Sequence, residues 1–442
     1  MTNVDSREII LDILLEILEQ DGYSHVVLNQ ALSKYQYLSK IERGFISRIT
    51  NGTLEYLIQI DYVINQYSKI KISKMKPLIR TVLRMSVYQI IYMDRIPDSA
   101  VCNEAVKLTV KRRFQGLKGF VNGVLRTIIR EKDHLNWPTD SVRYSIPDWI
   151  LSIWRTCYEP SVIEQMLQSF LEPKKLMVRC NRNQTDQESI LKSLKDQGVL
   201  AEQNTMIPTM LQLSNIDYIE DLEAFSKGWI QVQDISSAFV GEIVSPDKDS
   251  YVIDVCSAPG GKSLHIADLL QGTGLVEARD LTDYKVRLID ENITRSGLHN
   301  IRSKVQDALL PDLDSIEKAD VVLADLPCSG LGIIGRKPDI KYKMTPEKLA
   351  SLAQLQKDIL SVVYQYVKPG GILVYSTCTI NPEENQRNAE WFLENFPFDP
   401  VNIEGRLGKE IREDTMKNGW IQLLPGIHPC DGFFISVFRK NV

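Results

Sequence analysis

The spacing of apolar residues divides the chain into a helical first part and a mixed remainder. Between Ser6 and Arg130, apolar side chains recur three or four positions apart, clearly so in 60–67, 77–92 and 100–111. This period places them on one face of a helix. The pattern therefore predicts an all-α domain over residues 1–135.

The pattern changes after the proline-containing linker 136–140. The next stretch, 144–154, is predicted to be helical, and strands are predicted at 176–182 and 206–213 around an amphipathic helix at 187–197. Together these elements predict a small α+β module over residues 145–235. The module could guide RNA or brace the larger domains, and the sequence favours neither.

Short aliphatic runs bounded by turn residues mark the last part of the chain as an α/β domain over residues 236–442. Helices are predicted at 236–244 and 264–270, and a closing antiparallel hairpin at 420–425 with 432–439. The predicted parallel strands are 251–255, 275–276, 303–306, 321–323 and 372–375. A parallel Rossmann-like sheet closed by such a hairpin is the arrangement of class I methyltransferases, an inference from fold analogy.

Composition agrees with a soluble multidomain protein. The chain has 442 residues, 43% hydrophobic and 25% charged, and a net charge of -5. That length suggests two to four domains. No apolar run reaches the roughly 18 residues of a membrane span, and the acidic N-terminus argues against a signal peptide. We expect a cytosolic, monomeric protein without a membrane partner.

Seven cysteines occur singly, without the spacing of a metal site, so we expect free thiols and no metal. They are Cys102, Cys157, Cys180, Cys256, Cys328, Cys378 and Cys430. Cys328 and Cys378 each follow a predicted buried strand. Because parallel strands end at the same edge of a sheet, where ligands bind, both thiols should emerge there. Single buried cysteines are usually apolar filler, but two at adjacent strand ends favour chemistry.

A glycine turn between the first predicted strand and its helix indicates a cofactor site. A phosphate-binding P-loop would need glycine where Cys256 stands, and the dinucleotide pattern GxGxxG is absent. Asp280, Asp307 and Asp325 each end a later strand, and Asp280 is placed to bind ribose hydroxyls. This series fits an adenosine ligand without pyrophosphate, such as S-adenosylmethionine. The predicted cofactor residues are Cys256, Ser257, Ala258, Pro259, Gly260, Gly261, Lys262, Asp280, Asp307 and Asp325.

A basic stretch lies near the end of the helical domain. Residues 105–130 carry seven Lys or Arg and no acid. Such a stretch is either a solvated helix face or a surface that binds nucleic-acid phosphates in a salt-dependent way. Lys111, Arg112 and Arg113 are the predicted RNA-binding residues. The segment Gly119–Arg126 resembles the final helix of the NusB-like antitermination domain, an RNA-binding helical fold, and the resemblance covers about residues 5–135.

Five motifs within residues 230–442 are similar to the cytosine-5 RNA methyltransferase family. With the NusB-like start, the resemblance narrows to its RsmB (Sun or Fmu) branch, which acts on small-subunit (16S) ribosomal RNA. Leu326 and Leu331 depart from the usual pattern, as apolar variants beside intact positions. The motifs are Cys256–Lys262, Asp325–Gly330, Arg336–Lys341, Tyr375–Thr379 and Asn381–Asn385.

The resemblance implies how the cysteines would act on a cytidine that has left its stack. Carbon 5 of cytosine is a weak nucleophile, so a thiolate first adds at carbon 6. By resemblance Cys378 is that nucleophile, and Cys328 assists proton removal and product release. Cys328 is the rival nucleophile, because DNA cytosine methyltransferases use the Pro-Cys cysteine. Asp325 would hydrogen-bond the base at N3, and Lys262 would hold the loop or face the active site.

Three functions are weighed against one another. The first is methylation of carbon 5 of a cytidine in 16S ribosomal RNA. The second is a non-catalytic RNA-binding assembly or antitermination factor, against which the intact Asp325, Cys328, Cys378 and glycine loop argue. The third is methylation of a cytosine in DNA or in another RNA.

Overall fold

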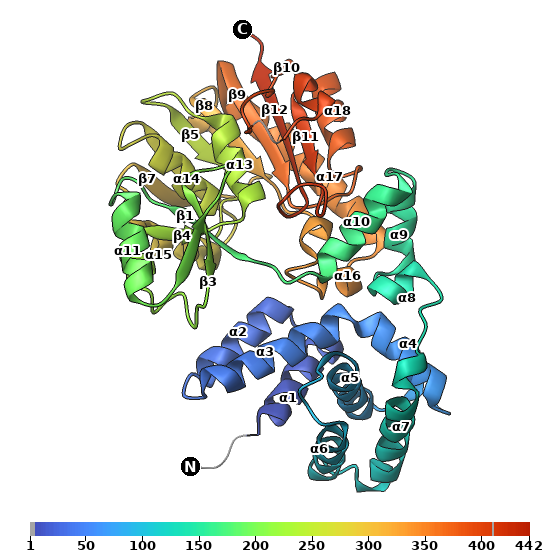
Figure 1. The fold of residues 1–442 in the computed structure, drawn as a ribbon. Coiled ribbons are helices and arrows are strands. Elements are labelled where there is room, and N and C mark those ends of the chain that lie inside the picture. The colour runs from blue at the N-terminus through green and yellow to red at the C-terminus, as the bar shows by residue number, and fades with distance from the viewer. Residues whose placement is uncertain (1–4, 409–410) are drawn as a thin grey trace. The chain divides into compact units, whose positions relative to one another are not determined.

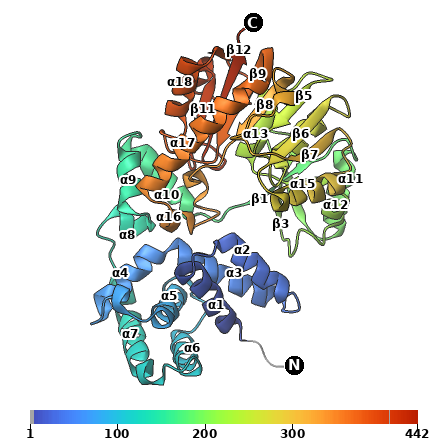
Figure 2. The ribbon, with the colours of Figure 1, turned by 180° about the vertical axis from the view of Figure 1, so that it is seen from behind.

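The computed structural model describes residues 5–408 and 411–442, and the chain divides into two compact units (Figures 1 and 2). The helical unit comprises Met1–Ile163, Phe170–Glu172 and Ile334–Lys343, of which residues 1–4 lie outside the described part. The sheet unit comprises Glu164–Ser169, Pro173–Ile333 and Met344–Val442.

The helical unit is all-α, as the sequence predicts. Its helices are α1 (Ser6–Glu19), α2 (Ser24–Lys34), α3 (Lys40–Glu55), α4 (Leu57–Tyr67), α5 (Pro77–Tyr92), α6 (Asp98–Lys111), α7 (Lys118–Glu131), α8 (Asp140–Tyr144), α9 (Asp148–Arg155) and α16 (Ile340–Lys343). Along the chain, α10 (Pro160–Leu171) is divided between the two units.

Helix α5 is the centre of the helical unit. It contacts α1, α3, α4, α6 and α7, and its buried residues lie on several sides of the helix, which is the pattern of a core helix. Pro77 occupies its first turn, where the missing N–H costs nothing. Gly52 of α3 lets the helices approach closely, because a Cβ there would lie 2.0 Å from the Tyr88 ring.

The segment Ile334–Lys343 interrupts the sheet unit in sequence and packs within the helical unit. The Asp339 carboxylate, 2% exposed, accepts hydrogen bonds from the backbone N–H and hydroxyl of Ser24 at 3.0 and 2.5 Å. The Lys341 Nζ donates to the carbonyl of Glu55 at 2.8 Å. These buried contacts make the segment part of the helical core.

The sheet unit is built on an eight-stranded sheet with the order β10-β12-β9-β8-β5-β6-β7, and β11 pairs with β12. The strands β7, β6, β5, β8 and β9 are parallel, and β12 runs antiparallel to β9, β10 and β11. The strands are β5 (Tyr251–Asp254), β6 (Leu275–Asp280), β7 (Ile301–Val305), β8 (Ala319–Asp325), β9 (Val367–Thr377), β10 (Phe398–Pro400), β11 (Trp420–Leu423) and β12 (Phe433–Lys440).

Helices cover both faces of this sheet (Figure 1). Alternate residues of a strand point to opposite faces, so Val252 packs in one core with α13 and α14, and Ile253 packs in another with α17 and α18. The two faces make a three-layer α/β architecture, as predicted. The helices are α13 (Ile235–Val244), α14 (Gly261–Leu269), α15 (Asp283–Ser296), α17 (Pro346–Val363) and α18 (Gln386–Asn395).

Of the small α+β module predicted over residues 145–235, the part from residue 173 onward belongs to the sheet unit, whereas residues 145–163 belong to the helical unit. Its antiparallel sheet has the order β2-β3-β1-β4, and Val178 and Cys180 pack under α11. On the other face, the Arg179 guanidinium pairs with Asp268 of α14 at 2.5 Å, both almost fully buried. The module thus packs against α14 of the larger sheet. Its elements are β1 (Leu176–Cys180), α11 (Gln187–Asp196), β2 (Leu200–Gln203), β3 (Met210–Ser214), α12 (Glu223–Ser226) and β4 (Ile230–Val232).

Several predicted elements differ in extent from the observed ones, and for two of them the local structure gives the reason. Residues 206–209 are not strand, because the Asn204 side chain accepts the N–H groups of Met206 and Ile207, both at 2.9 Å, and turns the chain. The predicted helix over 144–154 is interrupted, because Ser145 has a left-handed φ of 54° and Pro147 precedes the start of α9. No helix among the described residues is long and apolar enough to cross a membrane.

Candidate active site

The two cysteines that follow β8 and β9 meet at one edge of the sheet. The strands are parallel neighbours, and Asp325 is in register with Ser376. Their continuations bring the Sγ atoms of Cys328 and Cys378 to 3.3 Å. The expected convergence of the two thiols is therefore confirmed, and it places them within reach of the same ligand atom.

An ion pair lies beside the thiols. The Lys262 ammonium donates to Oδ2 of Asp325 at 2.7 Å, and Ser376 donates to Oδ1 at 2.7 Å. The ammonium also lies 5.1 Å from the centre of the Phe433 ring. Burial acts to lower the pKa of Lys262, but the attraction of Asp325 and of the Cys378 thiolate outweighs it and raises the pKa. Lys262 therefore faces the cysteines as a cation.

The neighbouring thiol and burial both act on the ionisation of Cys328. Hydrogen bonding to Cys378 is the largest cause that raises the pKa of Cys328 well above its usual value, followed by burial and by the charges of Cys378 and Glu384. Cys328 is therefore protonated at neutral pH. Either sulfur can donate the hydrogen bond that joins the two thiols.

The glycine loop between β5 and α14 is ordered by its own polar groups. The Ser257 hydroxyl lies 2.7 Å from that of Ser263, which donates to Asp254. Gly260 has φ of 101°, which an L side chain rarely adopts. Gly261 opens α14, and a Cβ there would meet nothing within 4 Å. The N-terminus of α14 is thus open to a ligand.

The predicted acids end their strands, with different surroundings. Asp280 is buried and accepts the N–H of Ala258 at 2.9 Å, which fastens the glycine loop to β6. Asp307 is half-buried and accepts the N–H of Leu309 at 2.9 Å, a local cap.

Burial raises the pKa of the Cys256 thiol. Cys256 is thus better suited to packing in the loop than to nucleophilic chemistry.

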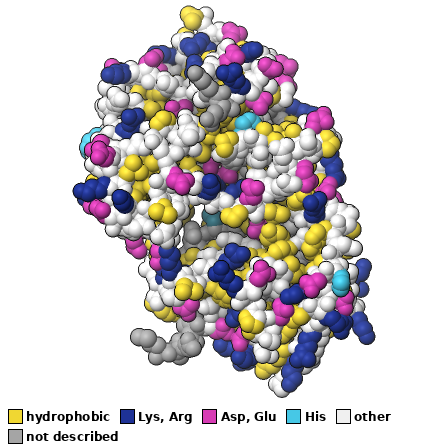
Figure 3. All heavy atoms as spheres, in the orientation of Figure 1, with side chains coloured by type: hydrophobic (Ala, Val, Ile, Leu, Met, Phe, Trp, Pro, Cys, Tyr) yellow, Lys and Arg dark blue, Asp and Glu magenta, His cyan; other side chains and the backbone are white. Residues whose placement is uncertain are grey.

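The basic stretch of the helical unit is partly neutralised. Lys111 pairs with Glu8 at 2.5 Å, and Arg112 pairs with Asp12 at 2.6 Å. Arg113 follows the end of α6 and is exposed. Lys and Arg side chains also gather over α7 (Figure 3). The predicted cations thus lie at the surface, and two of them already have carboxylate partners.

Sequence reasoning gave no role to the residues that connect the two cysteine loops. Glu384 and Asn385 lie on the turn after Cys378 and are almost fully buried. Ser329 directly follows Cys328 and binds Glu384 through its backbone N–H at 2.8 Å. A signal was present, because two acids and two amides next to a strand-end cysteine are more polar than a buried turn requires.

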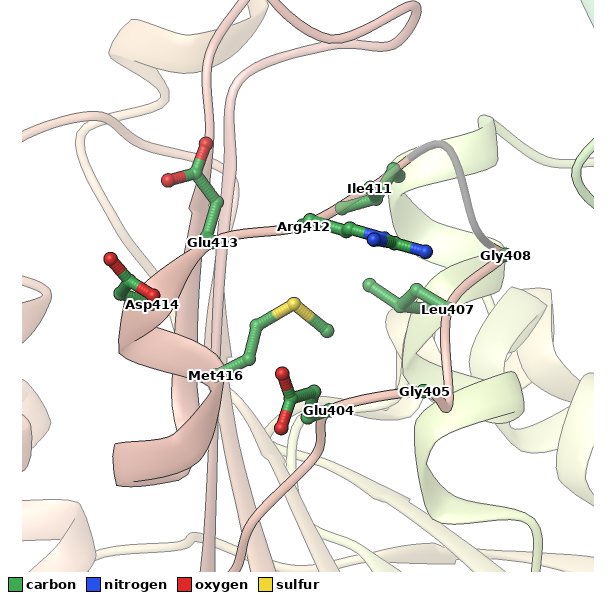
Figure 4. A pocket seen from close by; sticks show the side chains of 9 residues that line it. All are labelled: Glu404, Gly405, Leu407, Gly408, Ile411, Arg412, Glu413, Asp414 and Met416. Atoms are coloured by element: carbon green, nitrogen blue, oxygen red, sulfur yellow. The ribbon is translucent and has the colours of Figure 1, made fainter.

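The hollow in Figure 4 is not this site. It measures about 740 Å³ and lies in the segment between β10 and β11, lined by residues such as Leu407, Arg412 and Met416. It contains none of the predicted catalytic or cofactor residues. Within residues 5–408 and 411–442, no three His, Cys, Asp or Glu side chains are grouped to hold a metal ion.

Comparison with known proteins assigns each part of the chain. Residues 242–439 match the family model described as 16S rRNA methyltransferase RsmB/F. Residues 4–130 match the NusB family. Residues 146–218 match the ferredoxin-like domain of RsmF/B-like methyltransferases. The three matches follow the order of domains expected from the sequence, and the ferredoxin-like match includes residues 146–163, which belong to the helical unit.

Full-length relatives agree with these matches. The chain is 35% identical over 100% of both chains to a probable ribosomal RNA small subunit methyltransferase B of Bacillus subtilis. It is 29% identical to ribosomal RNA small subunit methyltransferase B of Proteus mirabilis, again over both full lengths.

Solved structures support the same fold. The crystal structure of PH0851 matches with a TM-score of 0.83 and 25% identity, covering 99% of both chains. NSun6 from Pyrococcus horikoshii with SFG matches with a TM-score of 0.58 and 22% identity, over 65% of this chain and 97% of that chain. From its full-length relatives and its matched domains, the chain belongs to the RsmB/F family of 16S ribosomal RNA methyltransferases.

Proposed function

We propose that this chain performs its family's reaction, methylation of carbon 5 of a cytidine in 16S ribosomal RNA, through a covalent bond between Cys378 and carbon 6. The observation that carries the assignment is the pair of thiols 3.3 Å apart beside the Lys262–Asp325 ion pair. The RNA substrate rests on the family and on relatives named as small-subunit ribosomal RNA methyltransferases.

Cys378 is the better nucleophile of the two. Addition at carbon 6 requires a thiolate, and Cys378 has the Lys262 cation and the Cys328 S–H to stabilise one. Cys328 is held as a thiol by the same hydrogen bond. When the sulfur of Cys378 bonds to carbon 6, the π electrons of the base move toward carbon 5, which becomes nucleophilic.

Asp325 stabilises the adduct. Its carboxylate ends β8 beside the thiols and already accepts from Lys262 and Ser376. A cytosine that takes a proton from water at N3 donates this N3–H to the carboxylate, and the resulting cationic ring takes up the electron pair that addition at carbon 6 releases. The carboxylate is fixed in place, so it stabilises the protonated ring without reorganisation.

Cys328 becomes a base only after the adduct forms. Once Cys378 is bonded to carbon 6, its thiolate charge and its hydrogen bond are lost, and with them two of the causes that raise the pKa of Cys328. Cys328 can then lose its proton to water and accept the proton of carbon 5. The electrons of that C–H bond restore the ring double bond, and the C–S bond breaks to release Cys378 as a thiolate.

The glycine loop fits S-adenosylmethionine, which supplies the methyl group when bound. The open N-terminus of α14 at Gly261 offers backbone N–H groups and a positive helix end. Asp280 ends β6 and Asp307 lies two residues beyond the end of β7, where a ribose and an adenine would lie. Residues 256–262 would hold the cofactor, with Lys262 reaching from the loop to the thiols.

Labelled methyl transfer from S-adenosylmethionine to unmodified 16S ribosomal RNA tests the assignment. Cys378→Ala is expected to abolish transfer, because no thiolate remains to activate carbon 5. Cys328→Ala is expected to accumulate a denaturant-resistant RNA adduct, because elimination stalls. Cys430→Ala, which changes another partly buried thiol of the same unit, is the matched control and should retain activity. Full activity of Cys378→Ala, or an adduct trapped on Cys328, would overturn the roles.

A further inference from the structure

Glu384 is a buried carboxylate with an unusual set of partners. Its side chain is 0% exposed. Oε2 accepts the Ser329 N–H at 2.8 Å and the Gln356 amide at 3.1 Å. Oε1 accepts the Ser329 hydroxyl and the Asn381 amide, the latter at 3.0 Å. Each oxygen thus receives two donors, which matches the four lone-pair sites of an ionised carboxylate.

These bonds connect Glu384 to both cysteine loops. Ser329 follows Cys328 directly, and Thr379 follows Cys378 directly. The Ser329 and Thr379 hydroxyls lie 2.8 Å apart. Because Ser329 gives its hydroxyl proton to Glu384, the Thr379 hydroxyl donates to Ser329. A directed chain therefore runs from one cysteine loop through the other to the carboxylate.

The neighbouring Asn385 fixes the second loop on both sides. Its Oδ1 accepts the Thr377 hydroxyl at 2.5 Å, and its Nδ2 donates to the carbonyl of Thr379 at 2.9 Å. Cys378 lies between those two residues. The turn that carries Glu384 and Asn385 thus holds the backbone around Cys378 and ties it to the loop of Cys328.

We infer that Glu384 is a positioning residue that sets the distance between Cys328 and Cys378 by anchoring Ser329 and, through it, Thr379. This inference rests on the proposed function, because it matters for catalysis only if both thiols act. The effect of Glu384 on the geometry of the two loops does not depend on the proposed function. Without the carboxylate, the Ser329 N–H and hydroxyl lose their acceptor, and the bridge from Ser329 to Thr379 is no longer anchored.

The charge of Glu384 is essential to this role. The substitution Glu384→Gln would keep the shape of the side chain but replace one oxygen by an NH₂ group. At Oε2 the new NH₂ group would meet the Ser329 N–H and the Gln356 amide, both donors. At Oε1 it would meet the donating Asn381 amide and force the Ser329 hydroxyl to reverse its direction. Buried donors left without acceptors are costly, so the loops would shift to find new partners. Shifts of about 1 Å in a catalytic constellation lower rates by about 100-fold.

Kinetics of Glu384→Gln provide the first test. At saturating RNA, kcat is expected to fall by about 10- to 100-fold, with the KM for S-adenosylmethionine changed less than about twofold, since Glu384 binds none of the residues of the glycine loop. Glu383→Gln is the matched control on the same turn, because Glu383 is exposed and pairs with Arg387. Equal kcat for Glu384→Gln and wild type would refute the inference.

A thiol probe tests the geometry without any methyl transfer. Phenylarsine oxide bonds two neighbouring thiols together and releases water. Wild type is expected to form this ring through Cys328 and Cys378, as shown by its loss in Cys328→Ser and in Cys378→Ser. Glu384→Gln and Ser329→Ala should form it at least about tenfold more slowly, in line with the cost of misplacement. Unchanged rates would overturn the inference even if the proposed function holds.

A double-mutant cycle separates positioning from general loss of stability. Ser329→Ala and Thr379→Val each remove the same hydroxyl bridge. If the bridge is what positions the thiols, the double variant should lose no more kcat than the stronger single variant. Fully multiplicative losses would show that the two hydroxyls act independently and would contradict the inference.

The arsenical and methylation experiments can fail separately. Slower ring formation in Glu384→Gln, together with full activity of Cys378→Ala, would mean that the inferred geometry is right and the proposed function is wrong.

Discussion

The site at the ends of β8 and β9 and the basic stretch at the end of α6 both contain cations, but the two regions use them differently. Lys262 is largely buried, with a side chain 13% exposed, and it faces Asp325 and the thiols. Lys111 is 58% exposed and pairs with a surface carboxylate of α1. The first cation is held by the packing of several elements, whereas the second is held by one neighbour in water.

This difference teaches where a charge can be assigned a function. Removing a charge from water costs several kcal/mol unless the charge is paired. Packing alone therefore does not explain a buried cation beside reactive groups, and a function is the better explanation. An exposed ion pair contributes about 0–1 kcal/mol and is screened by salt. Burial, more than the number of charges, therefore separates the two regions.

The largest expected effect comes from Lys262→Met. Loss of the cation beside Cys378 removes a fixed charge from the site, and adduct formation should slow by about 100-fold or more. Quenched-flow measurement of the RNA adduct in a Cys328→Ala background isolates this step. Lys285→Met is the matched control, because Lys285 also pairs with a strand-end acid but is 47% exposed. If both variants slowed adduct formation equally, burial of the cation would not explain the role of Lys262.

Lys341 shows whether burial of a cation also has a measurable effect in the helical unit, here on the pH dependence of stability. Burial lowers the pKa of Lys341 to about 7 from 10.5. Between these values the folded state holds neutral Lys341 while the unfolded chain is protonated, so the unfolded state binds more protons. The free energy of unfolding, relative to Lys341→Met, should therefore rise by about 1.4 kcal/mol per pH unit from pH 7 toward pH 10. Urea unfolding of both proteins across this range measures it, and a constant difference would contradict the prediction.

The smallest effect is expected from charge reversal at Lys111, Arg112 and Arg113. Two of these cations are already offset by Glu8 and Asp12, so RNA affinity should weaken only modestly. The slope of log affinity against log salt should fall by about 0.7–0.9 for each phosphate that the protein no longer neutralises. Arg113→Glu alone should give a larger change than Arg112→Glu. An unchanged slope would make this stretch a solvated helix face.

The spacing of apolar residues predicted many helices and strands, because this spacing depends only on neighbours along the chain. The bounds of α5 agree with the predicted 77–92, and β8 and β9 contain the predicted apolar runs. The missed turn at 206–209 has a different cause. The Asn204 side chain competes with the strand for backbone N–H groups, and apolar spacing does not register such competition.

Some candidate site residues could be predicted from local pattern, and others depend on distant partners. The convergence of Cys328 and Cys378 follows from the rule that parallel strands end together. The roles of Lys262 and Glu384 depend on partners 63 and 55 positions away in sequence. The sequence names the Asn381–Asn385 turn as part of a resemblance, but only the fold brings its side chains to Ser329.

The sequence by itself determined the order of domains, the strand-end thiols, the glycine loop and the family resemblance. Only the tertiary structure decided that β1 is joined to α14 by the Arg179–Asp268 ion pair, and that Ile334–Lys343 packs in the helical unit. The physical reason is that periodicity depends on neighbours along the chain. Hydrogen bonds and buried ion pairs depend on which distant segments the core brings together.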